Sequence, residues 1–107
     1  NFYNTIDEII NIIYDKKINF NNMINIKNIC EKIFINCYDI NELLNCIYFI
    51  LIDKNKNDID LVYKIIDESL KSNINIFNST GKFFIHLENY IIKLIFLINN
   101  IKKLILI

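Results

Sequence analysis

The sequence predicts an all-α fold in which antiparallel helical pairs stack as a short α-solenoid, with a five-helix bundle as the alternative. Two similar octapeptides support the stack. Ile9–Lys16 (IINIIYDK) resembles Ile47–Lys54 (IYFILIDK), which lies 38 positions later. Each octapeptide closes an amphipathic segment, and a polar loop and a second amphipathic segment follow it. Repeated two-helix units of this length are typical of solenoids, whereas a bundle requires only antiparallel neighbours.

The composition favours a single helical-repeat domain covering residues 1–107, which we expect to be a fragment of a larger chain. Apolar residues make up 53% of the sequence, which is enough to build a core. Isoleucine and asparagine dominate while alanine, arginine and proline are absent, a bias typical of A/T-rich codons. We therefore interpret Ile simply as apolar and Asn simply as polar. Twelve lysines balance twelve acidic residues, so the net charge provides no long-range attraction to nucleic acid or membranes.

The first predicted pair consists of helices over residues 6–16 and 22–37. Thr5 and Glu8 have the spacing of a capping box at the start of the first helix. Asn21 or Asn22 is the expected cap of the second helix. Helical spacing predicts two inner stripes. They are Ile6, Ile9, Ile10 and Ile13 in the first helix, and Met23, Ile26, Ile29, Cys30, Ile33, Phe34 and Cys37 in the second.

The second predicted pair consists of helices over residues 40–53 and 59–72, capped by Asp39 and Asp58. The helix over 40–53 is apolar on nearly all sides, so we expect it to be the central and most buried helix. The predicted inner stripe of the helix over 59–72 is Ile59, Val62, Ile65, Ile66 and Leu70. Residues 73–81 are predicted to form a loop.

A long helix is predicted from about Lys82, capped by Ser79 or Thr80, with Asn99 and Asn100 as a possible break. Its apolar residues alternate three and four apart, which suits packing along a neighbouring helix. They are Phe84, Leu87, Ile91, Leu94, Ile98, Ile101 and Ile105. Charged and amide side chains interrupt residues 83–107 throughout, so we expect no membrane span.

No catalytic or metal-binding constellation is found in the sequence, and we expect neither an enzyme nor a cofactor. The three cysteines, Cys30, Cys37 and Cys46, lack metal-ligand spacing, and we expect free thiols that pack as small apolar residues in a reducing compartment. His86 and Glu88 lie two positions apart, where helical side chains diverge. The segment Ser79–Lys82 lacks the first glycine and the final hydroxyl residue of a phosphate-binding loop.

Two surfaces are candidates for binding. Lys16, Lys17, Lys54 and Lys56 occupy matching turns of the two predicted units, so they would line one edge of a stack and could contact RNA phosphates. The same lysines have a simpler interpretation as solvated loop residues. The apolar C-terminal segment, with Ile101, Leu104 and Ile105, is predicted to contact a partner because an exposed apolar end is unfavourable.

The units begin with short entries such as Asn1-Phe2 and Ile76-Phe77-Asn78, followed by two helices over about 38 residues. This pattern resembles the degenerate octotricopeptide-type repeats that precede RAP domains in apicomplexan organellar proteins. The resemblance implies a non-catalytic scaffold in a large organellar RNA–protein assembly, such as a mitochondrial ribosome, with other protein subunits and ribosomal RNA as partners. It implies a location in the mitochondrial matrix, with the cytoplasm as the other expectation. The alternative function is a HEAT- or MIF4G-like module that binds proteins.

Overall fold

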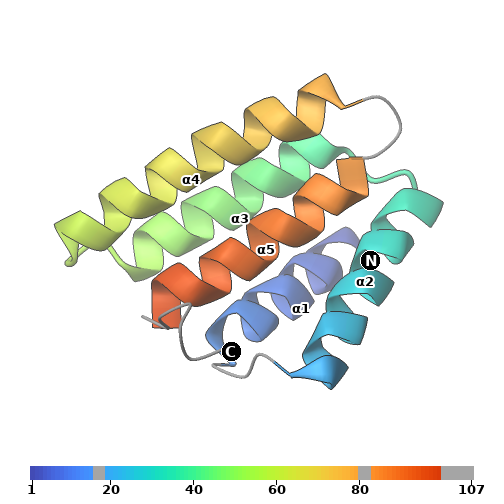
Figure 1. Cartoon of the computed structure of the whole chain (residues 1–107), viewed down its shortest axis with the longest axis horizontal. Helices are drawn as coiled ribbons and strands as arrows, with labels where there is room; N and C mark the ends of the chain where they lie inside the picture. The colour runs from blue at the N-terminus through green and yellow to red at the C-terminus, as the bar shows by residue number, and fades with distance from the viewer. Residues whose placement is uncertain (16–18, 80–82, 100–107) are drawn as a thin grey trace.

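The computed structural model describes residues 1–15, 19–79 and 83–99, and every regular element in these ranges is an α-helix. The all-α prediction is therefore confirmed. Figure 1 shows the arrangement of the helices. They are α1 (Phe2–Tyr14), α2 (Phe20–Ile35), α3 (Ile40–Lys54), α4 (Ile59–Asn78) and α5 (Phe83–Asn99).

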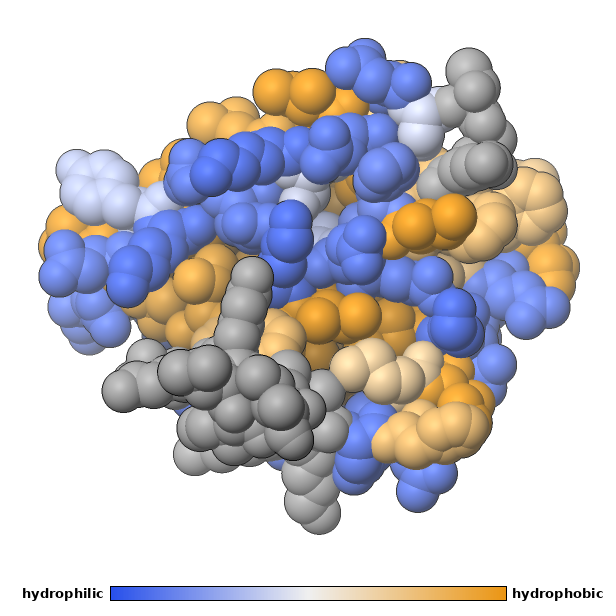
Figure 2. Space-filling view, viewed as in Figure 1, coloured by the Kyte–Doolittle hydropathy of each residue, from blue (hydrophilic) through white to orange (hydrophobic). Residues whose placement is uncertain are grey.

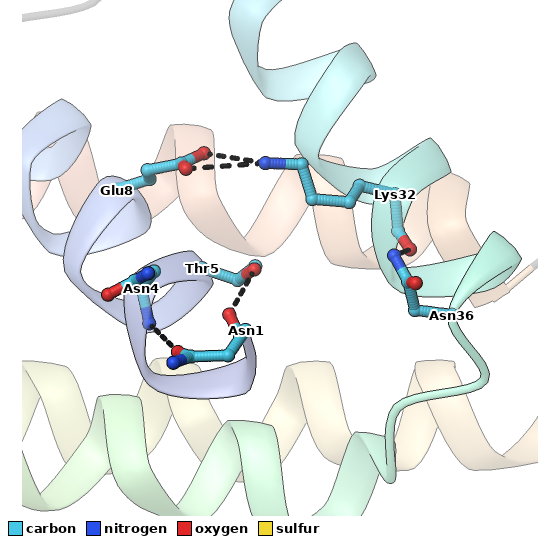
Figure 3. Close-up of polar contacts among 6 residues, drawn as sticks. All are labelled: Asn1, Asn4, Thr5, Glu8, Lys32 and Asn36. Atoms are coloured by element: carbon cyan, nitrogen blue, oxygen red, sulfur yellow. Dashed lines mark hydrogen bonds and ion pairs between the residues drawn. The ribbon is translucent and has the colours of Figure 1, made fainter.

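The first two helices begin before their predicted starts. Asn1 caps α1, because its side chain accepts a hydrogen bond from the Asn4 amide at 2.9 Å. The predicted cap Thr5 is instead buried inside α1, where its hydroxyl donates to the Asn1 carbonyl oxygen (Figure 3). Asn19, and not Asn21 or Asn22, caps α2. Asparagine is so frequent here that the first suitable one in each segment takes the capping role.

The third and fourth helices begin where the sequence predicts. The Asp39 carboxylate accepts hydrogen bonds from the Asn41 and Glu42 amides, and Asp58 accepts from the Leu61 amide at 3.2 Å. Both acids are N-caps, which satisfy amides that have no partner in the first helical turn.

The loop predicted over residues 73–81 is wrong for residues 73–78, because α4 continues to Asn78. Ile65, Ser69, Ser72 and Ile76 are buried and lie on one face of the helix, so packing favours extra helical turns despite Asn73 and Asn75. Ser79 ends α4 and does not cap α5: its hydroxyl donates to the Ile76 carbonyl oxygen at 2.8 Å. Thr80 and Lys82 lie outside the described residues.

The helices α1, α3 and α5 run in the same direction. Their C-terminal ends meet, since the Asn55 amide nitrogen donates to the Tyr14 hydroxyl at 3.0 Å and that of Asn99 donates to the Ile13 carbonyl oxygen at 2.7 Å. The last turns of α1 and α3 are therefore neighbours (Figure 1).

The helix α2 runs antiparallel to α1. Lys32 near the end of α2 pairs with Glu8 in the middle of α1 at 3.2 Å (Figure 3). At the other end, the Asn22 side chain donates to Asp15 at 3.2 Å. Glu8 thus binds a neighbouring helix and does not complete the predicted capping box.

The helices α4 and α5 are also antiparallel, and they pack closely. The buried hydroxyls of Ser69 and Tyr90 are 2.7 Å apart, and Lys93 lies 3.2 Å from Glu68. Glu68 Oε1 is buried without a well-oriented hydrogen bond. The positive charge of Lys93 therefore offsets the cost of removing this carboxylate oxygen from water. The small serines of α4 allow the close approach of the large Tyr90 ring.

The central helix is α5, and the prediction that α3 is central is wrong. The helix α5 packs against α1, α2 and α4, whereas α3 packs against α1 and α4 and leaves Phe49 65% exposed. In Figure 1, α5 lies across the middle of the molecule. Its core-facing residues are Leu87, Tyr90, Ile91, Leu94 and Ile95.

The helix α5 contacts the first helical pair, α1 and α2, as well as its sequence neighbour α4, and these contacts make the fold compact. In an extended solenoid each unit contacts only its neighbours, but here α5 contacts both α1 and α2 as well as α4. The Cα radius of gyration is 13.2 Å, close to the value of about 13 Å for a compact domain of 100 residues. The packing of the described helices is thus consistent with a small helical bundle or a short stack of helical pairs. Within the described ranges, no helix is both long and apolar enough for a membrane crossing.

Candidate protein-interaction surfaces

The predicted lysine edge is described only in part. Lys16 and Lys17 lie outside the described residues, and so do the predicted partner contacts Ile101, Leu104 and Ile105. Lys54 and Lys56 are described and exposed at the end of α3.

The environment of these two lysines combines aromatic and acidic groups. The Lys54 ammonium lies 5.6 Å from the centre of the Tyr14 ring, within cation–π range. Lys56 lies 3.9 Å from Asp53, an exposed pair that contributes little to stability. Lys54 is thus held against α1, and Lys56 is partly neutralised by a nearby acid.

Three residues considered for chemistry on sequence grounds, His86, Glu88 and Cys30, have structural surroundings. His86 is half-buried on α5, and Glu88 pairs with Lys27 of α2 at 3.0 Å. Burial, followed by the Glu88 charge, raises the pKa of the Cys30 thiol to about 12, so this cysteine is protonated at neutral pH. Cys37 does not lie on the inner face of α2: it follows the helix, is exposed, and has a φ of 53°. No cluster of metal-ligating side chains occurs among the residues that the structure describes.

A groove of about 620 Å³ lies between α1 and α3. We call it the α1–α3 groove. The side chains of α1 that line it are Tyr3, Ile6 and Asp7, and those from α3 and its cap are Asp39, Asn41, Glu42, Asn45, Cys46, Phe49 and Ile50. The groove therefore combines an apolar floor with polar edges, which is the usual composition of a ligand-binding surface.

Two exposed aromatic rings line the α1–α3 groove, Tyr3 from α1 and Phe49 from α3. Tyr3 is 66% exposed and Phe49 is 65% exposed. Each ring meets the preceding aromatic edge-on, Tyr3 with Phe2 and Phe49 with Tyr48, with 5.3 Å between ring centres in both pairs. These contacts restrict the two rings before any partner binds, which lowers the entropic cost of binding.

The charged side chains that line the α1–α3 groove, among the residues that the structure describes, all have one sign. They are the exposed carboxylates of Asp7, Asp39 and Glu42, with no described lysine beside them. Asp39 is held by its capping hydrogen bonds. Within the described ranges, no ion pair involves Asp7 or Glu42. The groove is thus an acidic region on a chain whose net charge is zero.

A second pocket, of about 380 Å³, lies between α2 and α5. Cys30, Phe34 and Phe84 form its apolar part, and the Lys27–Glu88 pair lies at its edge. Phe34 was predicted to face the core but is 60% exposed, because Ile26, Ile29, Cys30 and Ile33 already fill the face of α2 that meets α1 and α5. Phe84 is exposed for the same reason, since Leu87, Ile91 and Leu94 form the buried face of α5.

The outer face of α4 carries a third apolar surface. Ile59 and Leu70 were predicted to be in the core, but they are exposed together with Tyr63, Ile74 and Phe77. The buried face of α4 differs from the predicted one and consists of Ile65, Ser69, Ser72 and Ile76. Figure 2 shows apolar atoms at the upper edge of the molecule, where α4 runs in Figure 1, and polar side chains across the middle of this view.

Sequence analysis did not identify the α1–α3 groove. The signal available was the position of Tyr3 and Phe49 off the inner stripes of their helices, next to acidic residues. Comparison of the chain with family models, curated proteins and solved structures finds no match to any of them.

Proposed function

We propose that this chain is a non-catalytic helical scaffold that binds another protein, and that the α1–α3 groove receives a basic, partly apolar segment of that partner. The observation that carries the proposal is the combination of two exposed aromatic rings with three carboxylates in one groove, where no lysine occurs among the described lining residues. An amphipathic helix lying in such a groove is a common mode of peptide recognition.

The aromatic rings and the carboxylates have different roles in this proposal. Burial of Tyr3 and Phe49 supplies most of the affinity, because a large apolar side chain gains about 1.5–3 kcal/mol when fully buried. Exposed ion pairs contribute only about 0.2–1 kcal/mol each. Asp7 and Glu42 therefore favour lysine- or arginine-bearing partners and disfavour acidic ones. They contribute to the selectivity of binding more than to its affinity.

A labelled amphipathic helical peptide of lysine and leucine tests the proposal by fluorescence anisotropy. We expect it to bind the chain, with weaker binding at higher salt, and we expect the matching glutamate–leucine peptide not to bind. Glu42→Lys should weaken binding about tenfold, because it replaces an attraction by a repulsion. Glu31→Lys makes the same charge change on α2, away from the groove, and is the control.

Equal binding of the two peptides, or equal effects of Glu42→Lys and Glu31→Lys, would contradict the proposed function. Phe49→Asp separates the apolar contribution, since Phe49 is exposed and its replacement should leave the fold intact. Circular dichroism of each variant verifies that the helices remain.

A second candidate function is a scaffold in an organellar RNA–protein assembly. It is favoured by Lys54 and Asn55, which join α3 to Tyr14 at the edge where the sequence places its lysines. The carboxylates of the α1–α3 groove would repel phosphates, so RNA would have to bind at this other edge. Lys54→Glu with Lys56→Glu should then weaken RNA binding and reduce its salt dependence. Unchanged RNA binding, or none by the unmodified chain, would remove this candidate. A mitochondrial location is part of this candidate only.

A further inference from the structure

The exposed apolar residues of α4 form one continuous stripe. Ile59, Tyr63, Leu70, Ile74 and Phe77 are between 55% and 67% exposed. With about 100° of rotation per residue, these five fall within an arc of roughly 60° on the helix surface. The half-buried Ile66 fills the interval between Tyr63 and Leu70. We call these six residues the α4 stripe.

The exposed area of the α4 stripe approaches what one side of a protein interface needs. At about 150–250 Å² for each large side chain, five residues near 60% exposure present roughly 600 Å² of apolar surface. A specific interface of standard size buries about 800 Å² per partner. The stripe and the polar residues beside it therefore match one side of such an interface.

The order of side chains along the α4 stripe is close to self-complementary. When a copy of α4 is laid antiparallel with its centre on the centre of the first, Ile59 meets the partner's Phe77. Tyr63 then meets the partner's Ile74, and Ile66 meets the partner's Leu70. Each aromatic ring faces an aliphatic side chain, and no two rings compete for the same space.

The polar flank of the stripe is paired within each copy. Asp60, Lys64, Asp67 and Lys71 alternate in sign along this flank. Lys71 lies 2.9 Å from Asp67 of the same chain, and both side chains are about two-thirds exposed. The apolar side chains of the stripe are therefore the part that needs a partner, and the charged flank forms a polar rim.

We propose that the α4 stripe is the interface of a homodimer, in which two copies of α4 pack antiparallel about a two-fold axis near the middle of the helix. A two-fold interface uses the same surface on both copies, and the near-palindromic stripe satisfies this condition. The proposal does not rest on the α1–α3 groove. If both hold, the dimer presents two grooves, and a partner with two basic segments gains affinity by binding both.

Light scattering after gel filtration tests the dimer. We expect twice the chain mass of 12.8 kDa at micromolar concentrations. Leu70→Glu should return the mass to that of one chain, because it places two carboxylates at the centre of the contact. Ile35→Glu makes the same kind of change at an exposed residue of α2 and should leave the dimer intact. A monomeric unmodified chain, as expected if a different protein covers the stripe, would overturn the proposal, and so would a folded Leu70→Glu dimer.

Disulfide crosslinking tests the antiparallel register and does not depend on the folding of Leu70→Glu. Ile59→Cys and Phe77→Cys are made separately in a chain that carries Cys37→Ser and Cys46→Ser, so that only the buried Cys30 remains of the native thiols. Under mild oxidation we expect crosslinked dimers only when the two variants are mixed, since the two-fold axis brings residue 59 to the partner's residue 77. Crosslinking of either variant with itself indicates parallel helices and refutes the register. No crosslinking in the mixture refutes the interface.

Discussion

The buried hydrogen bond between Ser69 and Tyr90 provides a quantitative test of the α4–α5 packing. The two hydroxyl oxygens are 2.7 Å apart, and the residues are 7% and 2% exposed. Tyr90→Phe keeps the ring and removes only the hydroxyl. The loss is one hydrogen bond, and the Ser69 hydroxyl is left buried without this partner. A buried polar group that loses its partner costs about 1–3 kcal/mol, so Tyr90→Phe should lower the free energy of unfolding by that amount.

A double-mutant cycle separates this bond from other effects. Ser69→Ala also removes the bond, but it gains about 0.5 kcal/mol from the higher helix propensity of alanine. The combined variant leaves no hydroxyl unsatisfied, so it should be less destabilised than the sum of the two single variants by about 1–2 kcal/mol. The propensity gain cancels from this coupling energy.

Urea unfolding followed by circular dichroism measures all four chains at one protein concentration, since a dimer would make stability depend on concentration. For a domain of this size, 1 kcal/mol corresponds to about 4–8 °C in melting temperature, so the coupling is measurable by heating as well. Additive single effects, or a Tyr90→Phe variant as stable as the parent, would show that α4 and α5 do not pack in the register described.

Three further predictions concern stability. Ile47→Asn should destabilise the chain by about 3–5 kcal/mol, because Ile47 is fully buried and the amide would lack a partner, whereas Phe49→Asn at an exposed position should cost far less in the same urea assay. Asp39→Ala should cost about 1 kcal/mol through loss of the α3 cap, measured as a lower urea midpoint with unchanged slope. The raised pKa of Cys30, about 12 in the folded chain against 9.0, means that the unfolded thiol loses its proton first. Stability from this group is therefore complete below pH 9 and falls above it by up to about 1.4 kcal/mol per pH unit, so Cys30→Ala should have a flatter stability profile between pH 9 and 10.

Local signals in the sequence predicted the helices well. Asp39 and Asp58 are caps as expected, because a carboxylate just before an apolar periodic segment can accept hydrogen bonds from the free amides of the first helical turn. The helices α1, α2 and α3 contain the segments predicted for them to within a few residues. Their starts shifted where several asparagines competed to cap, as at Asn19 and Asn22.

Which face of each helix is buried depends on tertiary packing, and the local sequence pattern does not determine it. Isoleucine and phenylalanine are so abundant that α4 carries two apolar stripes, and the sequence pattern does not say which one meets α5. In the structure, the face of α4 that carries Ser69 and Ser72 is buried, because these small residues leave room for the Tyr90 ring. Serine is polar, so a search for periodic apolar residues does not detect this face. The α1–α3 groove requires the contact of two helices about 40 residues apart, and no local pattern encodes the acidic surroundings that this contact creates.

Protection of Cys46 tests most directly that the α1–α3 groove binds a basic segment. Cys46 lines the groove and is half-buried, whereas Cys30 is buried and protonated. In the Cys37→Ser chain, alkylation at Cys46 can be followed by mass spectrometry. We predict that the lysine–leucine peptide slows this alkylation in proportion to the bound fraction, and that the glutamate–leucine peptide does not. Alkylation of Cys46 at an unchanged rate in the presence of saturating lysine–leucine peptide would contradict binding in the groove.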